Sequence, residues 1–83
     1  MNKPSITLIL PAYNEAEALP PLLAAIADTR ASALPHLSVI VIDDGSKDDT
    51  AQVVRNFNKD WARLIQHPRN MGLAQAMRTG LAA

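Results

Sequence analysis

Three short polar segments contain the residues of this 83-residue chain whose types can do chemistry. Residues 11–15, Pro-Ala-Tyr-Asn-Glu, offer an aromatic ring for stacking and polar groups that can accept hydrogen bonds from a base or a ribose. Residues 43–50 begin with two adjacent aspartates, which can hold ribose hydroxyls, a base N–H or a metal. Residues 67–72 include Arg69 and Asn70, where a guanidinium and backbone N–H groups can meet a phosphate. Each segment therefore suits a polar ligand.

The same three segments also have structural interpretations, which the residues alone leave open. Residues 11–15 would then form a turn with a packed tyrosine, and Asn70 would cap a helix. Gly45 permits a positive φ, and the carboxylate spacing does not match a calcium-binding loop. The residues of the second segment that fit a helix cap and first turn are Ser46, Asp48 and Asp49.

Other common site-forming motifs are missing from the sequence. The glycines, Gly45, Gly72 and Gly80, form neither GxGxxG nor GxxxxGK[ST], which excludes ordinary dinucleotide-binding and P-loop sites. The absence of cysteine excludes disulfides, thiolate zinc sites and a cysteine nucleophile. His36 and His67 each stand beside a proline with no second ligand at metal spacing, so we interpret both as structural.

Strands and helices must alternate to position these segments. Short β-branched, apolar runs predict strands over residues 5–10 and 37–42, and a weaker run predicts a strand over 63–66. Helical spacing predicts helices over residues 20–30 and 48–58, with Pro20 and Pro21 tolerated in a first turn. A third helix follows a cap at Asn70. Its apolar residues recur every four positions at Leu73, Met77 and Leu81, while the small residues Gly72, Ala76 and Gly80 predict close packing against a strand.

The order β-α-β-α-β-α predicts an α/β fold, a three-layer Rossmann-like arrangement with parallel strands. In such sheets ligands bind beyond the carboxyl ends of the strands. The loops at residues 11–17, 43–49 and 67–72 converge on that edge.

Composition narrows the partners and the compartment. The formal net charge is +0 and no Lys/Arg cluster occurs, which excludes a nucleic-acid binder or a polybasic membrane surface. Hydrophobic residues make up 48%, enough for a packed core. No apolar run approaches the roughly 20 residues of a membrane-spanning helix. Residues 1–4 lead into a strand rather than a signal-peptide core, so we expect a cytoplasmic location.

Taken in order, these segments resemble the inverting family 2 glycosyltransferases of GT-A fold over nearly the whole chain. The resemblance rests on residues 11–15 after the first strand, on Ile42-Asp43-Asp44-Gly45-Ser46 with Asp48 and Thr50 after the second, and on Asn70-x-Gly72 with Ala76 and Gly80 in the third helix. Residues 69–73 and 78–80 are most similar to the enzymes that make polyprenol- or dolichol-phosphate sugars.

The resemblance implies a nucleotide-sugar donor, a UDP- or GDP-sugar. Three residues would line the nucleoside pocket: Pro11, Tyr13 and Glu15. Ile42 and Asp44 would contact the base, whereas Asp43 would be structural. Asn70 and Gly72 would flank the diphosphate.

Members of this family carry a DxD metal motif on the strand after the third helix, and a catalytic base in an acceptor half. This sequence has neither, so we assign it no catalytic and no metal-binding residue. We expect residues 1–83 to be the N-terminal, nucleotide-binding part of a family 2 domain, truncated before the DxD motif. It would bind a donor without transferring the sugar.

In the full-length enzyme, Mg²⁺ or Mn²⁺ would assist transfer to a polyprenyl phosphate or a glycan at the cytoplasmic face of a membrane. The short chain itself would self-associate through its open sheet edge. The alternative is a standalone, non-catalytic nucleotide-binding or interaction module. A receiver-like signalling domain is disfavoured, because receivers place their paired aspartates after the first strand and this pair follows the second.

Overall fold

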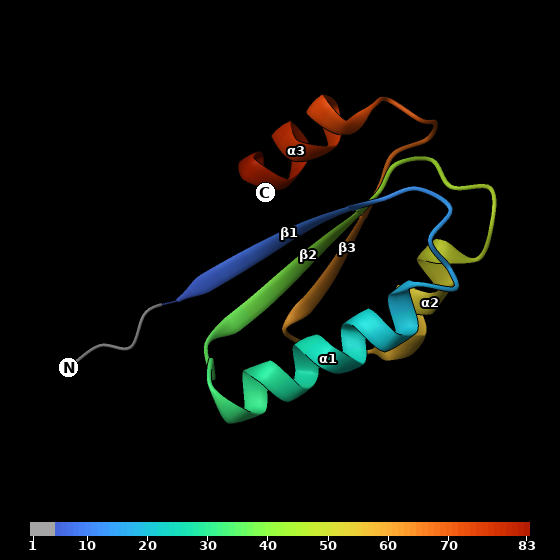
Figure 1. Ribbon diagram of the computed structural model, residues 1–83. Helices are drawn as coiled ribbons and strands as arrows, with labels where there is room; N and C mark the ends of the chain where they lie inside the picture. Colours follow the sequence, from blue (N-terminus) through green and yellow to red (C-terminus); the bar gives the residue numbers. More distant parts are fainter. Residues whose placement is uncertain (1–4) are drawn as a thin grey trace.

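Strands and helices alternate along the chain in the computed structural model, which describes residues 5–83 (Figure 1). The strands are β1 (Ile6–Ala12), β2 (Leu37–Asp43) and β3 (Ala62–Gln66). The helices are α1 (Leu19–Ser32), α2 (Thr50–Phe57) and α3 (Leu73–Ala82). The strands pair in parallel in the order β1-β2-β3, which confirms the predicted α/β class and element order. The expectation for residues 1–4 lies outside the described residues.

The sheet separates two layers of helices, with α1 and α2 on one face and α3 on the other (Figure 1). Because side chains alternate along a strand, β2 contributes to both layers. Leu37, Val39 and Val41 join the core that contains α1, whereas Ile40 and Ile42 join a second core with Ala76 of α3.

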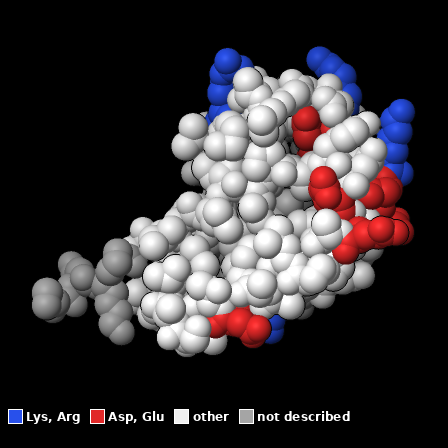
Figure 2. Space-filling view, in the orientation of Figure 1, with Lys and Arg blue, Asp and Glu red and all other residues white. Residues whose placement is uncertain are grey.

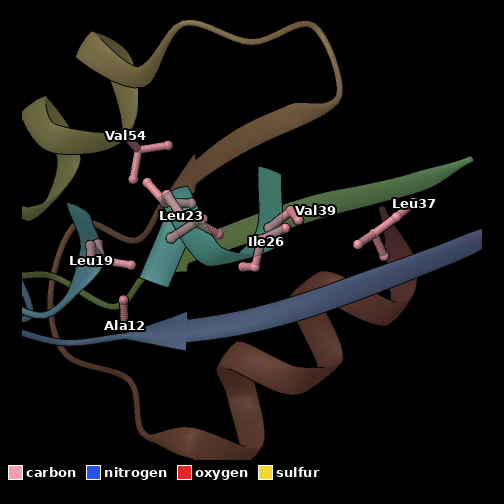
Figure 3. Packing of buried hydrophobic residues seen from close by; sticks show 8 residues of the cluster. Ala12, Leu19, Leu23, Ile26, Leu37, Val39 and Val54 are labelled. Carbon is pink, nitrogen blue, oxygen red and sulfur yellow. The ribbon is translucent and has the colours of Figure 1, made fainter. Parts of the chain in front are cut away.

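The core between the sheet and α1 consists of large apolar side chains. Leu19, Leu23 and Ile26 recur along α1 at helical spacing and are buried together. Figure 3 shows them beside Val54 of α2 and strand residues such as Val39. Trp61 packs at the margin of this core, where the ring of Phe57 meets its ring edge-on, with 5.4 Å between the two ring centroids. The guanidinium carbon of Arg30 lies over the Trp61 ring, 5.1 Å from its centroid.

The opposite face of the sheet is covered closely by small residues of α3. Ala76 is fully buried, and a Cβ on Gly80 would overlap Cγ2 of Ile9, so this helix approaches β1 where only glycine fits. The prediction of close packing is therefore confirmed for these two residues. It is wrong for Gly72, which precedes the helix with φ 91° and has no atom within 4 Å of a Cβ position.

The large apolar residues of α3 point away from the sheet. Leu73, Met77 and Leu81 are 69%, 36% and 74% exposed. Their spacing predicted the helix correctly, but they do not form its core-facing side. The close approach of Ala76 and Gly80 to the sheet turns them outward.

Most element boundaries lie one or two residues from the predicted ones, and the ends of β1 and α2 nearest the loops are two of them. Strand β1 continues through Pro11 to Ala12, because β1 is an edge strand and a proline there costs no ladder hydrogen bond on the open side. Helix α2 begins at Thr50 rather than Asp48. Helix α1 holds both prolines in its first turn as predicted. Among residues 5–83, no helix combines the length and the apolar character needed to cross a membrane.

Candidate functional site

The three loops at the carboxyl edge of the sheet touch one another. Gly45 lies in the left-handed region with φ 72°, and a Cβ there would lie 2.6 Å from the Cα of Arg69 and closer still to its carbonyl carbon. The loop after β2 therefore packs directly on the backbone of the loop after β3. Only glycine meets both the conformational and the steric demand at this position.

The loop after β2 also holds the loop after β1. The backbone N–H groups of residues 14–16 donate to Ser46 Oγ at 2.9 Å, Thr50 Oγ1 at 2.9 Å and Asp48 Oδ2 at 3.2 Å. In return, Asn14 Oδ1 accepts the N–H of Lys47 at 2.8 Å. These bonds cross more than 30 positions in the sequence and fix the two loops as one unit.

These contacts correct the predicted capping roles of Ser46 and Asp49. Asp49 is the residue before α2 and its side chain makes no capping bond, whereas Asp48 Oδ1 accepts the N–H of Thr50 at 3.0 Å at the start of this helix. Ser46 donates its N–H to Asp43 Oδ1 at 3.0 Å, and its hydroxyl accepts the N–H of Asn14. Likewise Gly72, not Asn70, precedes α3, and Asn70 Oδ1 accepts the Gly72 N–H at 3.1 Å within the loop. Asp43 is buried by this turn, which fits its expected structural role.

Thr50 helps to form the site, although the sequence analysis assigned it no role of its own. It is fully buried, and its hydroxyl donates to Asp48 while accepting from the first loop. Donation from the Thr50 hydroxyl, together with its N–H and that of Ala16, lowers the pKa of Asp48 below its ordinary value. The only sequence signal for Thr50 was its place in the family motif.

Asp44 forms the centre of a second set of contacts. Its Oδ1 accepts the N–H of Met71 and faces Nδ1 of His67, both at 2.8 Å, and its Oδ2 accepts the N–H of Gly72 at 3.0 Å. The hydrogen bond from His67 is the largest cause that lowers the pKa of Asp44, and the two backbone N–H groups add to it against the effect of burial. This carboxylate therefore ties the end of β2 to the start of α3.

His67 extends this set of contacts to the middle of α3. Its Nε2 lies 2.8 Å from Oγ1 of Thr79, and its side chain is 8% exposed. The structural interpretation of His67 agrees with this placement. The sequence carried no signal for its partners, which lie 23 and 12 positions away. His36, the other histidine, is exposed.

A cleft of about 260 Å³ opens between the end of β1 and the first turns of α3. It brings together five residues that the resemblance assigns to ligand binding: Pro11, Tyr13, Asp44, Asn70 and Gly72. The remaining lining residues are Ala12, Leu73 and Ala76. Tyr13 is 40% exposed, so its ring is free to contact a ligand.

Two of the implied residues lie outside this cleft. Glu15 lines a neighbouring open hollow of about 670 Å³ between the first two loops, where acidic side chains such as Asp48 and Asp49 gather. Figure 2 shows Asp and Glu concentrated on that side of the molecule. Ile42 has no exposed surface and packs with Ile40 and Ala76, so a base has no access to its side chain. We assign Ile42 to the core beneath the cleft.

In the part of the chain that the structure describes, no three His, Asp or Glu side chains are grouped to hold an ion. Asp44 accepts two hydrogen bonds on Oδ1 and one on Oδ2 from the chain itself.

The fold and this cleft can now be compared with known proteins. Residues 7–83 match the family described as glycosyl transferase family 2. The chain belongs to this family. It is 41% identical over 81 residues to dolichyl-phosphate beta-glucosyltransferase ALG5C of Trichomonas vaginalis, and these residues cover 89% of this chain and 24% of that protein. It is 32% identical over 85 residues to the human dolichyl-phosphate beta-glucosyltransferase, covering 92% of this chain and 26% of the human protein.

A solved structure agrees with this family membership. The mannosyltransferase PcManGT from Pyrobaculum calidifontis, in complex with GDP-Man and Mn²⁺, superposes with a TM-score of 0.72 at 31% identity. The match covers 98% of this chain and 24% of that structure. The GT-A-type, Rossmann-like arrangement is therefore shown for this family 2 chain. The chain spans about a quarter of the length of these relatives.

Proposed function

We propose that this chain is the nucleotide-binding part of a family 2 glycosyltransferase, and that the cleft between β1 and α3 takes the nucleoside of a nucleotide-sugar donor. The observation that carries the proposal is the meeting of Pro11, Tyr13, Asp44, Asn70 and Gly72 around one cleft from three separate loops. Tyr13 supplies an exposed aromatic ring for a base or a ribose. On the side where the diphosphate would lie, Asn70 supplies the N–H groups of its amide, and Gly72 supplies open space because it has no side chain.

Asp44 gives the proposal a chemical preference. An ionised carboxylate accepts about four hydrogen bonds, and the chain uses three of these positions, two on Oδ1 and one on Oδ2. One position on Oδ2 is left for a ligand. Because the pKa of Asp44 is lowered, the carboxylate is ionised at neutral pH, so this oxygen can accept a hydrogen bond but cannot donate one. Uracil and guanine carry a ring N–H that can donate to it, whereas cytosine and adenine can donate only through an exocyclic amino group. On this difference we propose UDP- or GDP-sugars as the donors.

The wider reaction is also a proposal. The names of the relatives support transfer of a sugar to a polyprenyl phosphate. We propose that a longer protein carries out this transfer at the cytoplasmic face of a membrane, with residues 1–83 as its nucleotide-binding part. We assign no step of the transfer itself to the described residues. Their contribution is to bind and orient the donor.

The open edge of β1 supports a further proposal about the isolated chain. Strand β1 pairs with β2 alone, so its outer backbone N–H and C=O groups can pair with another chain. We propose that the isolated chain self-associates through this edge.

Isothermal titration with UDP, GDP, CDP and ADP, with and without Mn²⁺, tests the nucleotide site. We expect UDP or GDP to bind at least about tenfold more tightly than CDP or ADP, without need of Mn²⁺. Asp44→Asn should remove this preference, because its amide presents N–H groups where the carboxylate accepts. Asp28→Ala, at an exposed position of α1, is the matched control and should bind normally. A folded chain that binds none of the four nucleotides would refute the proposal.

A further inference from the structure

His67 contacts the carboxylate at the proposed nucleotide site and does not line the cleft itself. Its ring lies behind Asp44, in a hollow lined also by Asp43, Ser46 and Pro68. The ring is nearly buried and both of its nitrogens have a partner, Asp44 Oδ1 at 2.8 Å and Thr79 Oγ1 at 2.8 Å.

The partners fix which nitrogen carries the proton. An ionised carboxylate only accepts, so Nδ1 of His67 must donate to Asp44. In the neutral ring Nε2 is then an acceptor, and the hydroxyl of Thr79 must donate to it. Gln75 Nε2 in turn approaches the same hydroxyl at 3.5 Å. The donors of these successive hydrogen bonds therefore all point toward Asp44, and hydrogen bonds arranged in this way polarise and strengthen one another.

This chain of hydrogen bonds fixes the orientation of the carboxylate. With His67 and the Met71 N–H both on Oδ1, and the Gly72 N–H on Oδ2, rotation of the carboxylate would break at least one bond. The same bonds attach α3 to the sheet at its start and at Thr79. Because α3 forms one wall of the cleft, its position also sets the width of the cleft.

We propose that His67 is a positioning residue for nucleotide recognition: its ring, oriented by Thr79, holds Asp44 so that one acceptor position of Oδ2 is kept for the base. The inference rests on the proposed nucleotide site. Neither His67 nor Thr79 lines the cleft, so an effect of either on binding must pass through Asp44 or α3.

The test compares variants at Thr79 and at the two histidines. Thr79→Val removes the hydroxyl and nearly keeps the side-chain shape, and Thr79→Ser restores the hydroxyl. His67→Ala removes the ring, and His67→Gln can donate and accept in its place. His36→Ala, at an exposed position, is the control. Each chain is titrated with UDP and GDP, its Tm is measured, and nitrogen-15 NMR follows the ring nitrogens of His67 and the amide protons of Met71 and Gly72.

We expect Thr79→Val to weaken nucleotide affinity about three- to tenfold and to shift the amide protons of Met71 and Gly72, with Thr79→Ser restoring both. His67→Ala should have a larger effect, His67→Gln should recover part of it, and His36→Ala should behave as the parent chain. A Thr79→Val chain with a lower Tm but unchanged affinity and amide shifts would show a merely structural role and overturn the inference.

The NMR measurement separates this inference from the proposed function. If the folded parent chain binds neither nucleotide, the proposed function fails, and the amide shifts still decide the positioning of Asp44. Shifts that stay unchanged in Thr79→Val, or a ring of His67 with its proton on Nε2 alone, would overturn the inference whatever the nucleotide titrations show.

Discussion

The two faces of the sheet are held by different forces. On the α1 face, large apolar side chains such as Leu23 and Val39 are removed almost entirely from water. On the α3 face, the helix buries the small residues Ala76 and Gly80 against isoleucines of the sheet, and the hydrogen bonds of Asp44 also attach the start of the helix. The large apolar residues of α3 remain exposed on the other side of the helix.

This difference explains why the cleft lies beside α3. The α1 face presents mainly apolar side chains, which offer no hydrogen bonds to a polar ligand. A helix that approaches through small residues and is anchored by a carboxylate leaves polar groups at its edge. The α1 face should therefore respond most to lost volume, and the α3 face to lost hydrogen bonds.

Leu23→Ala is expected to give the largest effect on stability. Leu23 is 1% exposed, and truncating a leucine at such a site costs about 2–5 kcal/mol of unfolding free energy. Urea denaturation followed by circular dichroism measures the change. Leu22→Ala on the same helix is the control, because Leu22 is 43% exposed and its loss should cost within about 0.5 kcal/mol. Equal losses in the two variants would contradict the comparison.

Gly45→Ala comes next in expected size. A methyl group there would meet the Arg69 backbone and would also place an alanine at φ 72°, so we expect a loss of about 2–4 kcal/mol. Gly72→Ala is the matched control, since it has φ 91° but open space around the Cβ position. It should show only the conformational cost of about 1–2 kcal/mol. Equal losses would mean that the contact between the two loops carries no strain.

Asp44→Asn tests the anchoring of the α3 face, with an expected loss of about 1–3 kcal/mol at neutral pH. An asparagine can accept from only one of its two polar atoms, so at least one of the partners on Oδ1 and Oδ2 is left without an acceptor. Urea denaturation at pH 7 measures this loss.

The same carboxylate should make stability depend on acid. Folding lowers the pKa of Asp44 below its ordinary 3.8, mainly through the hydrogen bond from His67. The resulting stabilisation is complete well above pH 3.8 and is lost as the pH falls through the folded-state pKa. The parent chain should therefore lose more stability than Asp44→Asn between pH 5 and pH 2. Parallel acid titrations of the two chains would contradict the assignment.

Much of the fold was predictable from the sequence because its signals are local. The β-branched runs predicted the strands, and five of the implied binding residues meet around one cleft. The orientation of α3 was not predictable from periodicity, because residues 73, 77 and 81 and residues 76 and 80 both recur every four positions. Which set faces the sheet depends on how closely the helix approaches, and that is a property of the packed structure.

The hydrogen bonds that shape the site were not predictable for a related reason. Ser46 and Asp48 are typical capping residues, but because two loops distant in sequence meet, Ser46 Oγ accepts from Asn14 and Asp48 accepts from Ala16 as well as from Thr50 of its own helix. Likewise, the sequence shows no partner near His67, and only the folded structure brings Asp44 and Thr79 beside its ring. Residue types in the sequence indicate which side chains can form hydrogen bonds, and the tertiary structure determines which partners they bind.

The smallest expected effect on stability is at the outer side of α3, and it tests whether that side is free. Leu81 is 74% exposed, so Leu81→Gln should change the unfolding free energy by within about 0.5 kcal/mol at low protein concentration. If the isolated chain self-associates and covers this apolar side, the same variant should shift sedimentation velocity toward the monomer, and Arg78→Ala on the same helix should not. A stability loss in Leu81→Gln near that of Leu23→Ala would mean that the outer side of α3 is packed within one chain. The contrast between the two faces would then fail.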